Sequence, residues 1–124
     1  MPVRKKDGSV RLCVDYRRLN MVTKPDRFPL PNLNDAVFGL RGMRYFTSLD
    51  LVRGYYQVPL DEESRQYTAF ATPRAHWQFK RLSFGLRNAP SAFQRVMQSV
   101  LSGFPWRKVV VYIDDVLIMS DSFD

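Results

Sequence analysis

The chain has 124 residues, 45% of them hydrophobic and 25% charged, a composition typical of one globular domain and not of a disordered segment. A single cysteine, Cys13, excludes an internal disulfide and a zinc site of clustered thiolates, and a single histidine, His76, leaves little from which to build a histidine-based metal site or a catalytic triad. We expect both residues to be structural or incidental. The net charge of +7 favours an anionic partner, with nucleic acid as the first candidate and an ordinary basic protein as the alternative.

Neither a membrane span nor a secretory signal is expected. The longest apolar run, residues 109–113, is far shorter than the roughly 20 residues that a membrane span needs. The basic residues near the N-terminus are not followed by an apolar segment, as they would be in a signal peptide. The sequence therefore predicts an intracellular, cytoplasmic protein that does not use a membrane as a partner.

The N-terminal part, residues 1–31, is predicted to be a basic hairpin followed by a connector. Eight basic and three acidic residues give this part a net charge of +5. Asp7-Gly8 is a strong turn signal, and alternating apolar residues after it indicate a β-hairpin over residues 5–14. Three prolines within residues 25–34 favour an extended connector, because proline cannot continue a helix or donate to a sheet.

The remainder, residues 32–124, is predicted to mix short strands with helices. Helices are expected at residues 33–40 and 89–102; the second has apolar residues at the spacing of one helical face, and Gly103 follows it. Strands are expected at residues 45–50, 67–71, 77–80, 109–113 and 116–119. Because strands and helices do not alternate regularly, the predicted fold class is α+β, built around an antiparallel sheet.

Three aspartates are the candidates for a catalytic or metal-binding role. Asp114 and Asp115 separate the last two predicted strands, where a glycine-containing turn is usual, and Asp50 ends an earlier strand. If that strand pairs beside the hairpin, three carboxylates meet at one edge of the sheet, and a cation would relieve their repulsion. Oxygen ligands suit Mg²⁺ or Mn²⁺, and two such ions about 4 Å apart can clamp the attacking and leaving oxygens of a phosphoryl transfer. The alternative is a solvated turn with Asp50 as a cap.

Four blocks of the sequence resemble reverse transcriptases, in the order in which that family carries them. The tetrad Tyr-Ile-Asp-Asp at residues 112–115 is similar to the YxDD signature. Residues 46–60 resemble the first palm motif, and residues 82–94 resemble the motif that carries the template-side helix. Residues 5–11 and 14–20 resemble the fingers hairpin and the strand after it. The letters FGL and NAPSAFQ in the third block are most similar to gypsy-type LTR retrotransposons.

The resemblance implies a fingers and palm portion of a right-hand polymerase, with the thumb absent. Its activity would be RNA-directed DNA synthesis, the transfer of a nucleotide from a dNTP to a primer 3′-hydroxyl on an RNA or DNA template. Asp50, Asp114 and Asp115 would be catalytic and, with the Leu51 carbonyl, would bind two Mg²⁺ ions, for which Mn²⁺ could substitute. Asp50 and Asp114 would bridge the ions, and Asp115 would lie at the periphery.

The resemblance also implies residues for the nucleotide and for the template. Lys5 and Arg11 would grip the triphosphate, with ordinary surface charge as the alternative. Tyr55 would lie under the sugar and select deoxynucleotides, unless it is an ordinary half-buried tyrosine. The remaining members of the two sets are Phe84 and Gly85 for the nucleotide, and Tyr112, Ile113, Gln94 and Arg95 for the template or primer. Gln94 and Arg95 are expected on the polar face of the helix, where solvation is the alternative.

On this interpretation the chain is a partial reverse transcriptase domain. Residues 1–31 would be a fingers-like hairpin and connector, and residues 32–124 a palm with an interleaved fingers segment. The expected partners are an RNA or DNA template-primer, a dNTP, and the remainder of a pol polyprotein: thumb, RNase H and integrase. Without a thumb we expect little processive synthesis and some exposed apolar surface. The alternatives are an inactive retrotransposon remnant that only binds nucleic acid and a metal-dependent nuclease; Tyr55 argues against an RNA-dependent RNA polymerase.

Overall fold

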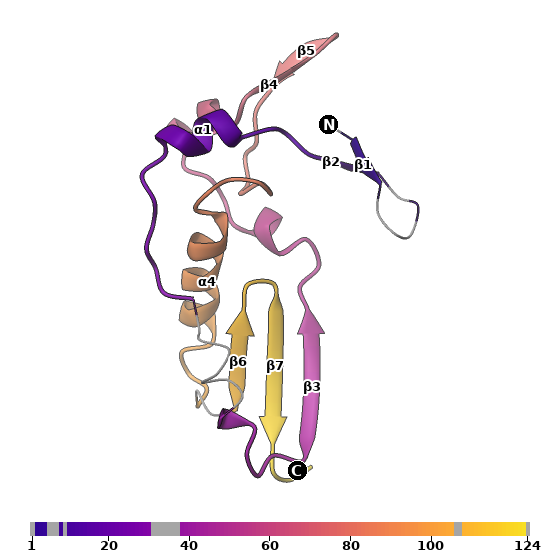
Figure 1. Ribbon diagram of the computed structural model, residues 1–124, viewed down its shortest axis with the longest axis vertical. Helices are drawn as coiled ribbons and strands as arrows, with labels where there is room; N and C mark the ends of the chain where they lie inside the picture. The colour runs from indigo at the N-terminus through magenta and orange to yellow at the C-terminus, as the bar shows by residue number, and fades with distance from the viewer. Residues whose placement is uncertain (1, 5–7, 9, 31–37, 106–107, 124) are drawn as a thin grey trace. The chain divides into compact units, whose positions relative to one another are not determined.

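The computed structural model describes residues 2–4, 8, 10–30, 38–105 and 108–123 (Figure 1). Its contacts divide the chain into two units, which we describe separately. The first unit is formed by Met1–Pro25 and Tyr55–Ala89, and the second by Asp26–Gly54 and Pro90–Asp124. Both mix helical turns with antiparallel strands, as the predicted α+β class requires. The predicted domain boundary after residue 31 stays a prediction.

The first unit begins with the predicted hairpin. Strands β1 (Pro2–Arg4) and β2 (Val10–Leu12) pair antiparallel, and Gly8 in their connection has a φ of 81°. Helix α1 (Arg17–Val22) follows, although the resemblance predicted a strand over residues 14–20, and that prediction was wrong. The segment is rich in residues of good helix propensity, and Asp15 Oδ1 accepts the Arg17 N–H at the start of the helix. A local backbone preference therefore outweighs the alternation that a strand would need.

The rest of this unit consists of short elements around a second hairpin. They are η1 (Gly54–Gln57), which begins at the junction between the units, α3 (Glu62–Arg65), η2 (Gln66–Thr68), β4 (Phe70–Thr72) and β5 (Ala75–Trp77). The hairpin was predicted with strands at 67–71 and 77–80, so both strands are shifted toward a tighter turn. The Thr72 hydroxyl accepts the Ala75 N–H at 3.2 Å, which closes the turn over residues 73 and 74.

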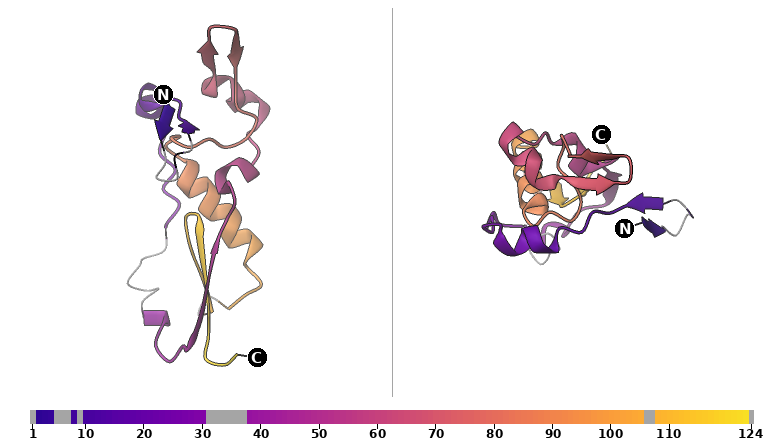
Figure 2. Two further views of the ribbon diagram at one scale, coloured as in Figure 1. Left: turned by 90° about the vertical axis from the view of Figure 1, so that its right-hand side faces the viewer. Right: turned by 90° about the horizontal axis from the view of Figure 1, so that it is seen from above.

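The second unit contains a three-stranded antiparallel sheet in the order β3-β7-β6. Its strands are β3 (Tyr45–Asp50), β6 (Val109–Tyr112) and β7 (Asp115–Ser120). Helix α4 (Ala89–Val100) lies against one face of this sheet, which Figure 2 shows edge-on. The strand predicted at residues 45–50 is confirmed, and so is the long helix, which ends two residues earlier than predicted. Of the helix predicted at 33–40, residues 31–37 lie outside the described part, and Phe38 and Gly39 are helical.

The core of the second unit forms between α4 and the strands. Its buried apolar residues are Phe93, Met97, Val111, Val116 and Met119. The buried stripe of α4 differs from the predicted apolar face: Val96 and Val100 are exposed, whereas Gln94 is fully buried. Strand β3 leaves Tyr45, Phe46 and Leu49 exposed, in agreement with the predicted apolar surface. In the described part of the chain, every helix is too short or too polar to cross a membrane.

Candidate active site

Pairing across the sheet brings the three aspartates together in the second unit. Asp50 at the end of β3 is the register partner of Asp115, and Asp115 is in turn the partner of Tyr112 on β6. Residues directly opposite in antiparallel strands have Cα atoms about 4.5–5.5 Å apart and point to the same face. Asp114 is the residue before Asp115, and its carbonyl accepts the Leu51 N–H at 3.4 Å. The convergence that the sequence required is therefore present.

The turn between β6 and β7 lies one residue earlier than predicted. Ile113 and Asp114 form it, and Asp115 is the first residue of β7 instead of part of the tip. Ile113 has a φ of 57°, and a positive φ at the first turn residue alone is the pattern of a type II′ turn, where glycine is preferred. A β-branched residue in this conformation is strained, and such strain is concentrated at functional sites.

Gly54 lets the Asp114 carboxylate approach the backbone. A Cβ added to Gly54 would lie 3.0 Å from Asp114 Oδ1 and 3.0 Å from Phe93 Cζ, so a side chain at this position would displace both groups. The Gly54 N–H donates to the Leu51 carbonyl at 3.2 Å. That carbonyl was predicted as a metal ligand, and since a carbonyl oxygen has two lone pairs, the bond leaves it one acceptor site.

The donor set suits a hard divalent cation, because it offers carboxylate and carbonyl oxygens from Asp50, Leu51, Asp114 and Asp115. Within the described ranges, however, the side chains of Asp, Glu, His and Cys form no group of three that is close enough to hold a metal ion. The backbone thus places the ligands at one end of the sheet, while their oxygens are more widely spread than a bound ion requires. Binding of an ion would have to draw the carboxylates together.

Two of the residues predicted for the nucleotide, Tyr55 and Phe84, belong to an aromatic cluster in the first unit. Tyr55 is only 7% exposed, more buried than was expected for a sugar contact. Its ring centre lies 4.8 Å from that of Phe84, which also contacts Tyr56 edge-on at 5.5 Å. Tyr56 in turn stacks with Phe79 at 6.1 Å. Tyr55 and Phe84 therefore support each other, and the cluster fixes the backbone that leads to Gly85.

The loop at Gly85 is held by two residues from the α1 region. Gly85 is exposed and has a φ of 90°, which favours glycine. Asn20 donates from Nδ2 to the Gly85 carbonyl at 2.8 Å and accepts the Arg87 N–H at 2.8 Å. The buried Tyr16 donates its hydroxyl to the Thr68 carbonyl at 3.1 Å, and burial raises its pKa. Its ring lies where a Cβ at Gly85 would make ordinary contact, at 3.6 Å.

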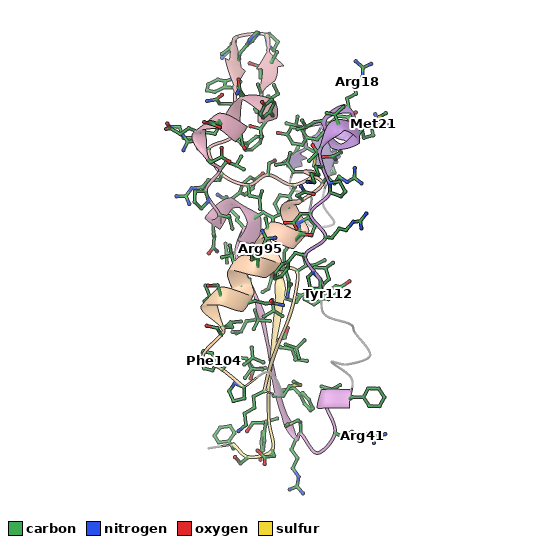
Figure 3. All side chains as sticks on the ribbon, turned by 90° about the vertical axis from the view of Figure 1, so that its left-hand side faces the viewer. Arg18, Met21, Arg41, Arg95, Phe104 and Tyr112 are labelled. Carbon is green, nitrogen blue, oxygen red and sulfur yellow. The ribbon has the colours of Figure 1, made fainter. Side chains whose placement is uncertain are left out.

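The structure describes the remaining predicted residues to different extents. Lys5 lies outside the described residues, and Arg11 is known only as a β2 residue paired with Val3. Tyr112 and Ile113 are half-buried at the hairpin. Arg95, on α4 in Figure 3, bonds the Asp26 carboxylate at 2.8 Å, and its guanidinium lies 4.8 Å from the centre of the Phe28 ring.

Gln94 was predicted on the polar face of the helix, and this was wrong. It is fully buried, and its amide bonds the backbone of the hairpin instead of facing solvent.

Comparison with known proteins places the chain in a family. The family model described as reverse transcriptase (RNA-dependent DNA polymerase) matches residues 3–124. The chain belongs to the reverse transcriptase family. The gypsy-type resemblance is confirmed, since the chain is 45% identical over 112 residues to the Pol polyprotein from transposon 297 of Drosophila melanogaster and 43% identical to that from transposon gypsy of the same organism. These matches cover 90% of this chain.

Related viral proteins extend the comparison to solved structures. This reverse transcriptase chain is 42% identical to the enzymatic polyprotein of figwort mosaic virus (strain DxS) over 95% of its length. A foamy viral protease-reverse transcriptase in complex with double-stranded DNA matches 98% of it with a TM-score of 0.87 and 26% identity. The chain covers 21% of that structure, 11% of each of the two Drosophila polyproteins and 18% of the figwort mosaic virus protein.

Sequence reasoning did not single out Gly54 or Asn20, and it assigned Gln94 to the template instead of to the hairpin backbone. Gln94 and Asn20 bond backbone groups that lie far away along the chain, and Gly54 stands where an added Cβ would meet the Asp114 carboxylate. A signal for Gln94 was present, because its neighbours Phe93 and Met97 both lie on the apolar stripe and a polar residue beside that stripe is a candidate for burial. For Asn20 and Gly54 the sequence offers only their inclusion in the family-like blocks.

Proposed function

We propose that this chain carries the nucleotidyl-transfer centre of an RNA-directed DNA polymerase. The observation that supports it most is the row of Asp50, Asp115 and Tyr112 across three neighbouring strands, with Asp114 in the adjoining turn. Like charges that lie directly opposite each other weaken a sheet. The arrangement therefore costs stability, and a bound divalent cation would remove that cost. The names of the relatives, Pol and enzymatic polyproteins, agree with this activity.

The catalytic groups would divide the work among them. Asp50, Asp114 and the Leu51 carbonyl would hold two Mg²⁺ or Mn²⁺ ions, and Asp115 would lie at the edge of the site. Such ions stabilise negative charge on the reacting phosphate and activate the attacking hydroxyl. Lys5 and Arg11 would neutralise the triphosphate. The Tyr55 ring, held against Phe84, would restrict the space beside the sugar and so favour deoxynucleotides.

The partner in this proposal is a primed template. Foamy viral relatives of the same fold are described in complex with an RNA/DNA hybrid and with double-stranded DNA, and the net charge of +7 suits a polyanion. Gly85 would approach the nucleotide or template through its backbone, and Tyr112 and Ile113 would lie near the primer end. The remaining parts of a pol polyprotein (thumb, RNase H and integrase) would complete the enzyme.

Single-nucleotide addition tests the proposal. The chain is mixed with a primed RNA template, the next dNTP and Mn²⁺, and the extended primer is separated on a gel. We expect Asp50→Asn and Asp114→Asn to lower the rate at least about 100-fold, because each removes a charged ligand. Asp121→Asn, which changes an exposed aspartate beyond the other end of β7, is the matched control and should match the unchanged chain.

Two results would decide against the proposal. If the unchanged chain binds the primed template but adds no nucleotide under any Mg²⁺ or Mn²⁺ concentration, the chain is a remnant that only binds nucleic acid. If it adds nucleotides and both aspartate variants do so at the same rate, the aspartates are not the catalytic centre.

A further inference from the structure

A buried amide spans the hairpin that carries two of the three aspartates. Gln94 on α4 has no exposed surface. Its Nε2 donates to the Val111 carbonyl at 3.1 Å, and its Oε1 accepts the Ile113 N–H at 3.2 Å. One side chain therefore bonds the backbone on both sides of Tyr112, at the point where β6 ends and the turn begins. Both bonds lie within the second unit.

The turn needs such support because of its conformation. Ile113 has a φ of 57°, which places the β-branched side chain of an L-residue in the left-handed region. A residue stays in a sparsely populated conformation only when the surrounding contacts determine it. The bond from the Ile113 N–H to Gln94 fixes the peptide plane that enters this residue. The bond to Val111 fixes the strand that leads to it.

We infer that Gln94 is a positioning residue that holds the turn in the conformation from which Asp114 and Asp115 reach the end of the sheet. The inference rests on the proposed function for its chemical meaning. If Ile113 relaxed to a negative φ, the peptide that follows would rotate, and the Asp114 carboxylate would leave its place beside Gly54. Gln94 would then influence metal binding without touching the metal.

The chemistry of the amide explains why glutamine is required at this position. The site asks for one donor and one acceptor on a side chain of this length. Methionine has a similar length and flexibility but leaves both backbone groups unpaired, which is costly where they are shielded from water. Gln98, one turn further along α4, is exposed and provides a matched control with the same chemical change.

The first measurement is hydrogen exchange of backbone amides by NMR on the 124-residue chain. We expect Gln94→Met to speed exchange at the Ile113 amide at least about tenfold relative to amides in the middle of β7, since the Ile113 N–H loses its acceptor. Gln98→Met should leave the rate unchanged. Equal exchange in both variants would overturn the inference, whatever the chain does with nucleotides.

The second measurement is the affinity for Mn²⁺, which is determined from water-proton relaxation in the presence of primed template and dNTP. We expect Gln94→Met to weaken the affinity about tenfold and Gln98→Met to leave it unchanged. Replacing Ile113 by glycine removes the penalty for positive φ. The double variant Gln94→Met/Ile113→Gly should therefore bind Mn²⁺ at least threefold more tightly than Gln94→Met alone. If Gln94 had only a general structural role, the added glycine would not raise the Mn²⁺ affinity. A double variant that binds no more tightly than Gln94→Met would therefore overturn the inference.

Failure of the inference and failure of the proposed function give different results. If the unchanged chain binds no Mn²⁺ but Gln94→Met still exposes the Ile113 amide, the proposed function fails and the support of the turn stands. If Mn²⁺ binds equally well with and without Gln94, the positioning role is overturned and the metal centre stands. Should Gln94→Met not fold, the unchanged chain decides: side-chain amide protons of Gln94 that exchange as fast as those of Gln98 overturn the inference, and protons at least tenfold slower support it.

Discussion

In the second unit a buried amide, Gln94, donates to a backbone carbonyl and accepts the N–H two residues later, and in the first unit Asn20 does the same at the Gly85 loop. Both bracketed segments contain a residue with positive φ, Ile113 in one and Gly85 in the other. Glycine adopts this conformation at little cost, whereas isoleucine does not. The two amide side chains differ in burial in the same sense: Gln94, at the strained turn, is fully buried, and Asn20, at the unstrained loop, is half-buried.

Removal of the aromatic support of the Gly85 loop should have the largest effect on stability. Tyr55 is 7% exposed and packs on Phe84. We expect Tyr55→Ala to lower the free energy of unfolding by about 3–5 kcal/mol, the usual cost of truncating a buried aromatic residue. Denaturant titration measures the change. Tyr55→Phe keeps the ring and should cost less than about 1.5 kcal/mol; a similar loss for both variants would contradict this explanation.

A methyl group added at Gly54 tests the packing around the Asp114 carboxylate in the second unit. A Cβ there would lie 3.0 Å from Asp114 Oδ1 and from Phe93 Cζ, so these atoms must move. We expect Gly54→Ala to cost about 1–3 kcal/mol and to weaken Mn²⁺ binding, because the displaced group is a proposed ligand. Gly103 has no atom within 4 Å of its Cβ position. Gly103→Ala should therefore leave Mn²⁺ affinity unchanged, and a loss there equal to that of Gly54→Ala would exclude a specific clash.

Loss of the amide in the first unit is expected to have a moderate effect. Asn20→Leu removes the bonds to Gly85 and Arg87 and should cost about 1–3 kcal/mol, since each net hydrogen bond contributes about 0.5–1.5 kcal/mol. Asn20→Asp keeps the acceptor for the Arg87 N–H and loses the donor, so its thermal midpoint should lie between those of Asn20→Leu and the unchanged chain. A thermal midpoint for Asn20→Leu equal to that of the unchanged chain would show that the two bonds of Asn20 do not stabilise the first unit.

The two residues with positive φ should respond in opposite directions. Gly85→Ala places a Cβ at ordinary contact distances, so its expected cost of about 1–2 kcal/mol is conformational. Ile113→Gly relieves the strain and should be neutral or stabilising by up to about 1 kcal/mol after the loss of side-chain contacts. Denaturant titration of both variants measures the signs. If Ile113→Gly were the more destabilising change, strain at the turn would not be the governing factor.

The smallest effect is expected at Arg95. Its ion pair with Asp26 and its contact with the Phe28 ring lie at the surface, and together they should contribute about 1 kcal/mol or less. Because Asp26 already pairs with this guanidinium, we expect Arg95→Ala to leave the salt dependence of template binding unchanged. A decrease of about one in the slope of log K against log salt would instead identify Arg95 as a phosphate contact.

Sequence reasoning succeeded where the relevant signal is local. The aromatic and β-branched character of residues 45–50 and the helical spacing after Ala89 correctly predicted β3 and α4. It failed where two signals compete over a few residues. The segment after Asp15 was expected to be extended and is helical, and the turn before Asp115 was placed one residue late. In the second case the residue that adopts positive φ is isoleucine, which no turn rule would select.

The sequence by itself determined the family, the kinds of elements, the charge, and which three carboxylates are proposed for the chemistry. It could do so because composition, period and motif order are properties of neighbouring residues. Only the tertiary structure decided that Asp50 pairs with Asp115, that Gln94 is buried under the turn, and that Asn20 brackets Gly85 and Arg87. The physical reason is that register and burial depend on how segments separated by 19 to 67 residues pack together, and no local preference specifies that packing.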